Sequence, residues 1–132
     1  MVVDASVGAE WFRPQGDPDA IAIYRLIRTG RAIGIVSPIF LFEVLNVAGR
    51  RWRYSARQLE GIRGRITGPV AYTFPPSTVA WCRWIDAGLT SYDASYAALS
   101  EEFGIPMATT DRQMLDLVPT ARDPRAVLGE LV

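Results

Sequence analysis

The opening residues MVVDAS (1–6) decide how the fold of this chain is interpreted. Their β-branched valines predict a short strand over residues 1–4, and the following residues predict a helix over 5–12. Asp4 lies at the junction, so its carboxylate is expected at the carboxyl end of the first strand. A strand that passes directly into a helix is typical of proteins in which strands and helices alternate.

The rest of the chain repeats this alternation. Three more strands are predicted, over residues 32–36, 70–74 and 106–109. After the first helix, seven more are predicted, over residues 19–29, 39–51, 55–66, 77–86, 92–103, 111–117 and 124–131. The pattern predicts an α/β domain with a mainly parallel sheet, whose ligands bind beyond the carboxyl ends of the strands.

Several helix ends have recognisable signals. Asp17, Ser55 with Gln58, and Thr90 or Ser91 are expected to cap helices at their N-termini. Ser37, followed by a proline, is expected to start the helix over 39–51. Two glycines are expected to end helices: Gly30 and Gly104.

Composition bounds the class of protein. The 132 residues fit one domain, 1–132, and 49% hydrophobic with 21% charged residues excludes a disordered chain. Cys82 is the only cysteine, which excludes an internal disulfide and a thiolate zinc cluster, fits a reducing cytoplasm and predicts a small buried side chain. No secretory signal is expected, and the apolar run 32–49 contains too many polar residues for a membrane span. The chain has no histidine, so histidine acid–base chemistry and histidine-ligated zinc are excluded.

Acidic residues are the candidates for chemistry, although each has an ordinary structural explanation. Asp4 and Asp111 stand where helices begin and could be caps, and Asp93 lies in a first helical turn, where the helix dipole favours negative charge. Glu43 lies in the apolar run PIFLFEVLNVAG (38–49), where a buried carboxylate needs a partner or a metal ion. Alternatively, Glu43 shares an exposed polar stripe with Asn46 and Arg50.

Together the acids favour metal-assisted chemistry. Hard divalent ions such as Mg²⁺ bind oxygen ligands, retain several waters and often bridge to phosphate. Hydrolysis of a phosphodiester with such an ion requires only carboxylates from the protein. Crowded carboxylates without a metal should also raise the pKa of at least one of them.

Three stretches carry a resemblance to a known family: VVDAS (2–6), SPIFLFEVLNV (37–47) and LTSYDASYAALSEEFGIPMATTD (89–111). With their spacing, they resemble PIN-domain proteins, specifically the VapC-type toxin ribonucleases of toxin–antitoxin pairs. The resemblance implies a three-layer α/β/α domain with four or five strands. It also implies an endoribonuclease dependent on Mg²⁺ or Mn²⁺, acting on RNA, homodimeric and inhibited by a cognate antitoxin.

The resemblance assigns roles to particular residues. The acids that match the family's catalytic and metal-binding quartet are Asp4, Glu43, Asp93 and Asp111. Thr109 matches a hydroxyl position before the last acid, and Asn46 a polar position one turn after the glutamate. Asp116 is a further acid, but we expect an exposed helix residue there.

Basic and aromatic residues supply candidates for RNA binding. The net charge is zero, every basic residue is arginine, and six of the 14 lie between residues 50 and 65. This segment is either a solvated helix or a surface for the RNA backbone, with Arg50, Arg51 and Arg53 nearest the acids. The tryptophans, Tyr92 and Tyr96 are expected in the core or a dimer contact, with Trp11 and Trp52 as the candidates for base stacking.

Two other functions compete with the nuclease. The chain could be a catalytically silent PIN-like module for binding or assembly, although the complete acidic quartet argues against this. It could also be a phosphotransfer domain with Asp4 as nucleophile, but no acid stands two residues later and no lysine is present to bind phosphate.

Overall fold

The computed structural model describes residues 1–75 and 77–131 and contains one parallel sheet. Its strands run in the order β3-β2-β1-β4-β5, and every pair is parallel. The strands are β1 (Val2–Val3), β2 (Ile35–Val36), β3 (Ala71–Tyr72), β4 (Met107–Ala108) and β5 (Ala121–Arg122). The first four lie inside the predicted ranges, whereas β5 was not located from the sequence.

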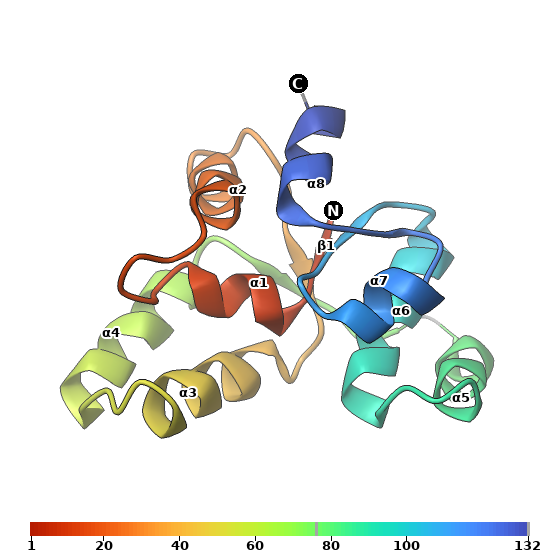
Figure 1. Ribbon diagram of the computed structural model, residues 1–132, viewed down its shortest axis with the longest axis horizontal. Helices are drawn as coiled ribbons and strands as arrows, with labels where there is room; N and C mark the ends of the chain where they lie inside the picture. The colour runs from red at the N-terminus through yellow and green to blue at the C-terminus, as the bar shows by residue number, and fades with distance from the viewer. Residues whose placement is uncertain (76, 132) are drawn as a thin grey trace.

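Helices flank this sheet, as predicted for an α/β/α domain. In Figure 1, α1 to α4 lie on one side of β1 and α5 to α7 on the other, while α8 lies beside α2. Helix α6 contacts β1 and β4, and α8 contacts β4 and β5. The helices are α1 (Ala5–Glu10), α2 (Pro18–Arg28), α3 (Phe40–Arg50), α4 (Ala56–Thr67), α5 (Thr78–Asp86), α6 (Ser91–Phe103), α7 (Arg112–Leu117) and α8 (Pro124–Leu131).

Most predicted helix ends are confirmed. Asp17 caps α2, Ser55 and Gln58 form a capping box at α4, and Thr90 caps α6. Gly30 and Gly104 follow α2 and α6 with φ angles of 72° and 62°, in the left-handed region that favours glycine.

The predicted range of α3, 39–51, lies within one residue of the observed Phe40–Arg50, but its predicted cap was wrong. The N-cap of α3 is Ile39, which makes no side-chain cap. Ser37 is instead buried, and its Oγ accepts a hydrogen bond of 2.8 Å from Ser95 Oγ of α6. The hydroxyl therefore links α6 to the end of β2 rather than capping a helix.

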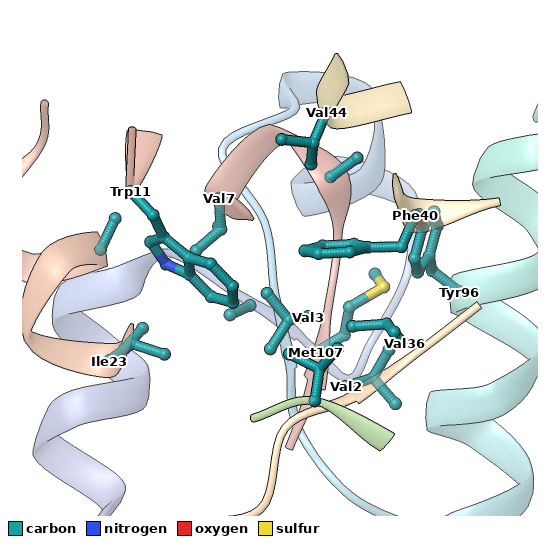
Figure 2. Close-up of a cluster of buried hydrophobic side chains, with 14 of the residues drawn as sticks. Val2, Val3, Val7, Trp11, Ile23, Val36, Phe40, Val44, Tyr96 and Met107 are labelled. Carbon is teal, nitrogen blue, oxygen red and sulfur yellow. The ribbon is translucent and has the colours of Figure 1, made fainter. Parts of the chain in front are cut away.

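The core surrounds the central strand β1. Val2 and Val3 are fully buried, and Figure 2 shows Phe40, Tyr96 and Met107 converging on them from α3, α6 and β4. Burial of each such side chain contributes about 1.5–3 kcal/mol relative to exposure. The core thereby fixes the three elements that also carry or adjoin the candidate acids.

Close packing of α1 on α3 depends on one glycine. A Cβ atom at Gly8 would lie only 2.2 Å from Cζ of Phe40, so no larger residue fits there without movement. Helix α3 therefore approaches α1 closely, which sets the distance between the two helices that border the candidate site.

Two side-chain predictions were wrong. Trp11, a candidate for base stacking, is buried in the core, where its ring stacks on Tyr24 with 4.8 Å between centroids. Cys82 was expected to be buried, but it is exposed on α5.

Candidate active site

One cleft brings together the four acids predicted from the sequence. It has a volume of about 380 Å³ and lies beyond the carboxyl ends of β1 and β4. The acids come from four elements: Asp4 follows β1, Glu43 lies in α3, Asp93 in α6, and Asp111 precedes α7. All four line this cleft, at the carboxyl edge of the sheet where ligands of parallel α/β domains are expected.

Asp4 is the most buried of the four, with 3% of its surface exposed. Its side chain does not cap α1, so the capping explanation is wrong for this residue. Its Oδ2 accepts hydrogen bonds from Ser6 Oγ at 2.6 Å and from Thr109 Oγ1 at 2.8 Å. These hydroxyls hold the carboxylate in one orientation, and its Oδ1 accepts no hydrogen bond from residues 1–75 or 77–131.

The same hydroxyls connect Asp4 to the loop after β4. Thr109 is fully buried, and its Oγ1 accepts a hydrogen bond of 3.0 Å from the backbone N–H of Asp111. Ser6 Oγ accepts one of 3.0 Å from the N–H of Thr110. We call Asp4, Ser6 and Thr109 the cleft floor. Because the floor ties two strand ends together, it fixes the position of Asp4 relative to Asp111.

Asp111 and Asp93 combine local and cleft-facing roles. Asp111 Oδ1 accepts a hydrogen bond of 2.9 Å from the N–H of Met114, so its predicted role as the N-cap of α7 is confirmed. Asp93 lies in the first turn of α6, where Thr90 supplies the cap. Both are partly exposed and line the cleft. The position of each at the start of a helix therefore does not explain why both also face the cleft.

A buried tyrosine, Tyr96, holds the side chain of Glu43. Glu43 is half-buried, and the hydroxyl of the fully buried Tyr96 donates a hydrogen bond of 2.7 Å to its Oε1. The exposed-stripe explanation therefore holds for Asn46 and Arg50, which are exposed, but not for Glu43. Asn46 lies in an adjoining hollow that it shares with Glu43, rather than in the acidic cleft.

Burial and like charges raise the pKa values of these acids. Burial raises the pKa of Asp4 to about 6, opposed by its hydroxyl hydrogen bonds and reinforced by Asp93 and Asp111. Burial, with smaller effects of Asp4 and Asp93, raises the pKa of Glu43 to about 7. The pKa of Asp93 is also raised, by burial and then by Asp111. The predicted effect of crowded carboxylates is confirmed, and a bound cation would oppose it.

The donor atoms suit a hard divalent cation. Among residues 1–75 and 77–131, no three histidine, cysteine, aspartate or glutamate side chains are placed to hold one metal ion together. Mg²⁺ does not require such a set, because it usually retains waters and takes one or two carboxylates with oxygens of a substrate phosphate. Asp4 presents an unbonded oxygen in a cleft that Asp93 and Asp111 also line, so an ion of this kind fits.

Other cleft residues were missed or misplaced by the sequence. Ser6 stands two residues after Asp4, a position that could have suggested it, whereas nothing in the sequence pointed to Arg13. Of the predicted RNA-binding arginines, Arg51 lines the cleft but Arg50 and Arg53 do not. Asp116 is exposed and lies in a separate hollow, as expected for an ordinary helix residue.

Fold and site together define the class of this protein. It is a parallel α/β domain with acidic residues beyond the carboxyl ends of its central strands. The chain belongs to the PIN domain family, whose model matches residues 1–118. No curated protein is a match to the sequence. No helix among the described residues is long and apolar enough to cross a membrane.

Solved structures share this fold. PAE2754 from Pyrobaculum aerophilum is 25% identical, with a TM-score of 0.69 over 98% of this chain and 87% of that chain. VapC20 from Mycobacterium tuberculosis, a sarcin–ricin loop cleaving toxin, is 18% identical, with a TM-score of 0.64 over 87% and 92% of the two chains. FitAcB from Neisseria gonorrhoeae is 15% identical, with a TM-score of 0.64 over 94% and 97%.

Proposed function

We propose that this chain is a metal-dependent endoribonuclease that acts as the toxin of a toxin–antitoxin pair. The observation that carries the proposal is the gathering of four carboxylates from four separate elements in one cleft. Ionised carboxylates in such a cleft repel each other, so this arrangement is unfavourable unless it binds a cation. Membership of the PIN domain family supports the nuclease class.

The residues divide the chemistry among them. One or two of the carboxylates of the quartet Asp4, Glu43, Asp93 and Asp111 would hold Mg²⁺ or Mn²⁺ directly, and the others would hold it through its waters. Such an ion would supply a more acidic water and would offset charge on a phosphodiester. Ser6 and Thr109 keep one oxygen of Asp4 occupied, so the other faces the cation. Glu43, held by Tyr96 at the cleft, is the carboxylate that accepts the proton of the attacking water.

RNA is the proposed substrate, and a protein antitoxin is the proposed inhibitor. VapC20, which shares the fold, is a toxin that cleaves the sarcin–ricin loop, and this supports a similar role here. Because bare carboxylates repel phosphate, a polyanion requires nearby cations, which Arg13 and Arg51 supply at the cleft. The proposed site of action is the cytoplasm.

A second copy of this chain is the proposed partner in a homodimer. Phe42 and Tyr92 are 76% and 60% exposed, and with Ile39 they line a hollow that adjoins the acidic cleft. Large exposed apolar side chains gathered in one place are typical of surfaces that another molecule covers. Light scattering during size-exclusion chromatography tests this proposal, and a monomer at micromolar concentration would contradict it.

The enzymatic proposal is tested by RNA cleavage in Mg²⁺ or Mn²⁺ and in EDTA. Asp93→Asn retains the size of the side chain but removes one charge from the cleft, so cleavage should fall at least about a hundredfold while the fold survives. Asp116→Asn is the matched control, because Asp116 is an exposed acid outside the cleft. Equal cleavage by wild type and Asp93→Asn, or cleavage in EDTA, would refute the assignment. RNA binding without cleavage by the wild type would favour the silent module instead.

A further inference from the structure

The acidic cleft is also lined by residues other than the quartet. Among them are Arg13, which follows α1, and Arg51 and Trp52, which follow α3. We call these three residues the basic wall. They place two cations and one large aromatic ring beside the carboxylates, although the two segments lie far apart in sequence. This combination is typical of a site that contacts both the phosphates and the bases of a nucleic acid.

The turn that carries Trp52 is held in a fixed conformation. Tyr54 hydrogen-bonds through its N–H to the carbonyl of Ala48 at 3.1 Å and through its hydroxyl to the carbonyl of Phe12 at 2.6 Å. The rings of Trp52 and Tyr54 are in contact, with 5.7 Å between centroids and 56° between planes. Trp52 is therefore supported from one side before any ligand binds, which limits the ordering cost of binding.

Backbone strain marks the same turn. Arg53 has a φ of 57°, in the left-handed region that a residue with a side chain adopts only at a cost of roughly 1–2 kcal/mol. Such conformations persist where surrounding contacts impose them, and they cluster at ligand-binding sites. Here the strained residue lies between Trp52 and Tyr54, so it determines how the tryptophan is presented to the cleft.

The two arginines of the basic wall differ in their partners. Arg51 is exposed and forms no ion pair with any residue that the structure describes. Arg13 pairs with Glu10 at 3.2 Å, and the other oxygen of Glu10 accepts a hydrogen bond of 3.0 Å from the N–H of Asp17. Because both oxygens of Glu10 are occupied, this fifth cleft carboxylate positions Arg13 rather than facing a cation.

We propose that Trp52 is a stacking platform for one unpaired base next to the cleaved phosphodiester, and that Arg13 and Arg51 contact the neighbouring phosphates. This inference rests on the proposed function and adds to it a residue that contacts a base of the RNA. In a duplex both faces of a base are covered by its neighbours, whereas an unstacked base in a loop or single strand has a free face for an aromatic ring. The carboxylates are then left to hold the cation at the phosphodiester itself.

The test is a double-mutant cycle that combines substitution of the tryptophan with removal of the base. The probe is a short labelled single-stranded RNA that the wild type cuts at one mapped position. It is compared with otherwise identical RNAs in which one nucleotide near that position lacks its base. Binding is measured in the cleavage-impaired Asp93→Asn background by fluorescence anisotropy.

A stacked base predicts a specific pattern of affinities. Removal of one base should weaken binding to Trp52-containing protein about five- to a hundredfold. Trp52→Leu should weaken binding of the intact RNA by a similar factor and then be insensitive to removal of that base. Trp52→Phe should retain part of the affinity, and Trp84→Leu, on α5 outside the cleft, should bind as the parent does.

Several outcomes would overturn the inference. Independent, multiplicative effects of Trp52→Leu and base removal would show that the ring and the base do not interact. If Trp52→Leu fails to fold, the base-removal series on Trp52-containing protein still tests the inference. An affinity that is unaffected by removal of any single base would show that no base is stacked. Absence of RNA cleavage by the wild type would instead refute the proposed function, and with it this inference.

Discussion

The cleft floor and the basic wall face the same space but are built in opposite ways. In the floor, Asp4 and Thr109 are buried and joined by a hydrogen bond of 2.8 Å between the ends of β1 and β4. In the wall, Arg51 is exposed and lies in a turn between two helices. Groups that must hold an exact geometry are thus placed on packed strands, whereas groups that contact a variable polymer are placed on loops.

The largest expected effect concerns the floor and the hydroxyl of Thr109. Thr109→Val has a similar shape but loses the hydrogen bond to Asp4 and the acceptor for the Asp111 N–H. Leaving these buried groups unsatisfied should cost about 1–3 kcal/mol of unfolding free energy. Because the orientation of Asp4 is then fixed only by Ser6, we expect the rate of RNA cleavage to fall about 10–100-fold.

Thr109→Ser is the matched variant, since it retains the hydroxyl and loses only a methyl group. It should recover most of the cleavage rate, as measured by initial rates in saturating Mg²⁺, with stability followed by urea unfolding. If Thr109→Val cleaves RNA as fast as the wild type, the Thr109 hydroxyl stabilises only the fold. The floor would then have no role in cleavage to contrast with the role of the wall.

A second prediction concerns the charge of Asp4 in the floor and of the neighbouring Glu43 in the absence of metal. Burial raises the pKa of Asp4 from 3.8 to about 6 and that of Glu43 from 4.5 to about 7. The folded protein therefore binds more protons than the unfolded chain between these values, so the free energy of unfolding must fall as the pH rises. The contribution is complete below about pH 4 and lost above about pH 7. It amounts to about 3 kcal/mol for Asp4 and to less for the partly exposed Glu43.

Urea unfolding in EDTA between about pH 5 and pH 8 measures this slope. Acid denaturation from other groups sets in at lower pH, which confines the test to this window. Mg²⁺ should stabilise the protein more at pH 8 than at pH 5, because cations bind the deprotonated carboxylates. A stability that rises with pH in EDTA would show that these acids are not buried and crowded in solution.

The acidic quartet could be predicted from the sequence for a physical reason that does not extend to the basic wall. Asp4 and Asp111 follow strands of a parallel sheet, and such strands end at one edge, so spacing along the chain predicts proximity in space. Glu43 could be predicted as well, because its apolar surroundings required a partner. That partner, Tyr96, lies 53 residues away and was expected only as a core or dimer residue.

Features without a repeating pattern could not be predicted. The position of Trp52 depends on the left-handed backbone conformation of Arg53. Nothing at residue 53 or beside it in the sequence indicates that conformation. Arg13 lines the cleft from the segment after α1, which carries no charge pattern that indicates a site. Strand β5 was missed because Ala121 and Arg122 lie between Pro119 and Pro124, without the unbroken run of β-branched or aromatic residues that predicts a strand.

The smallest expected effect separates two neighbouring arginines. Arg50 and Arg51 are both exposed at the end of α3, but only Arg51 lines the cleft. A diffuse positive surface would attract RNA through both equally, whereas a phosphate contact in the cleft involves only Arg51. With cleavage-impaired Asp93→Asn protein, Arg51→Gln should reduce the slope of log affinity for single-stranded RNA against log salt by roughly 0.7. Arg50→Gln should leave the slope unchanged, because its charge is not at the cleft. Equal changes in the two slopes would mean that Arg50 and Arg51 attract RNA through a general electrostatic field. The contrast between floor and wall would then apply to Trp52 but not to the arginines.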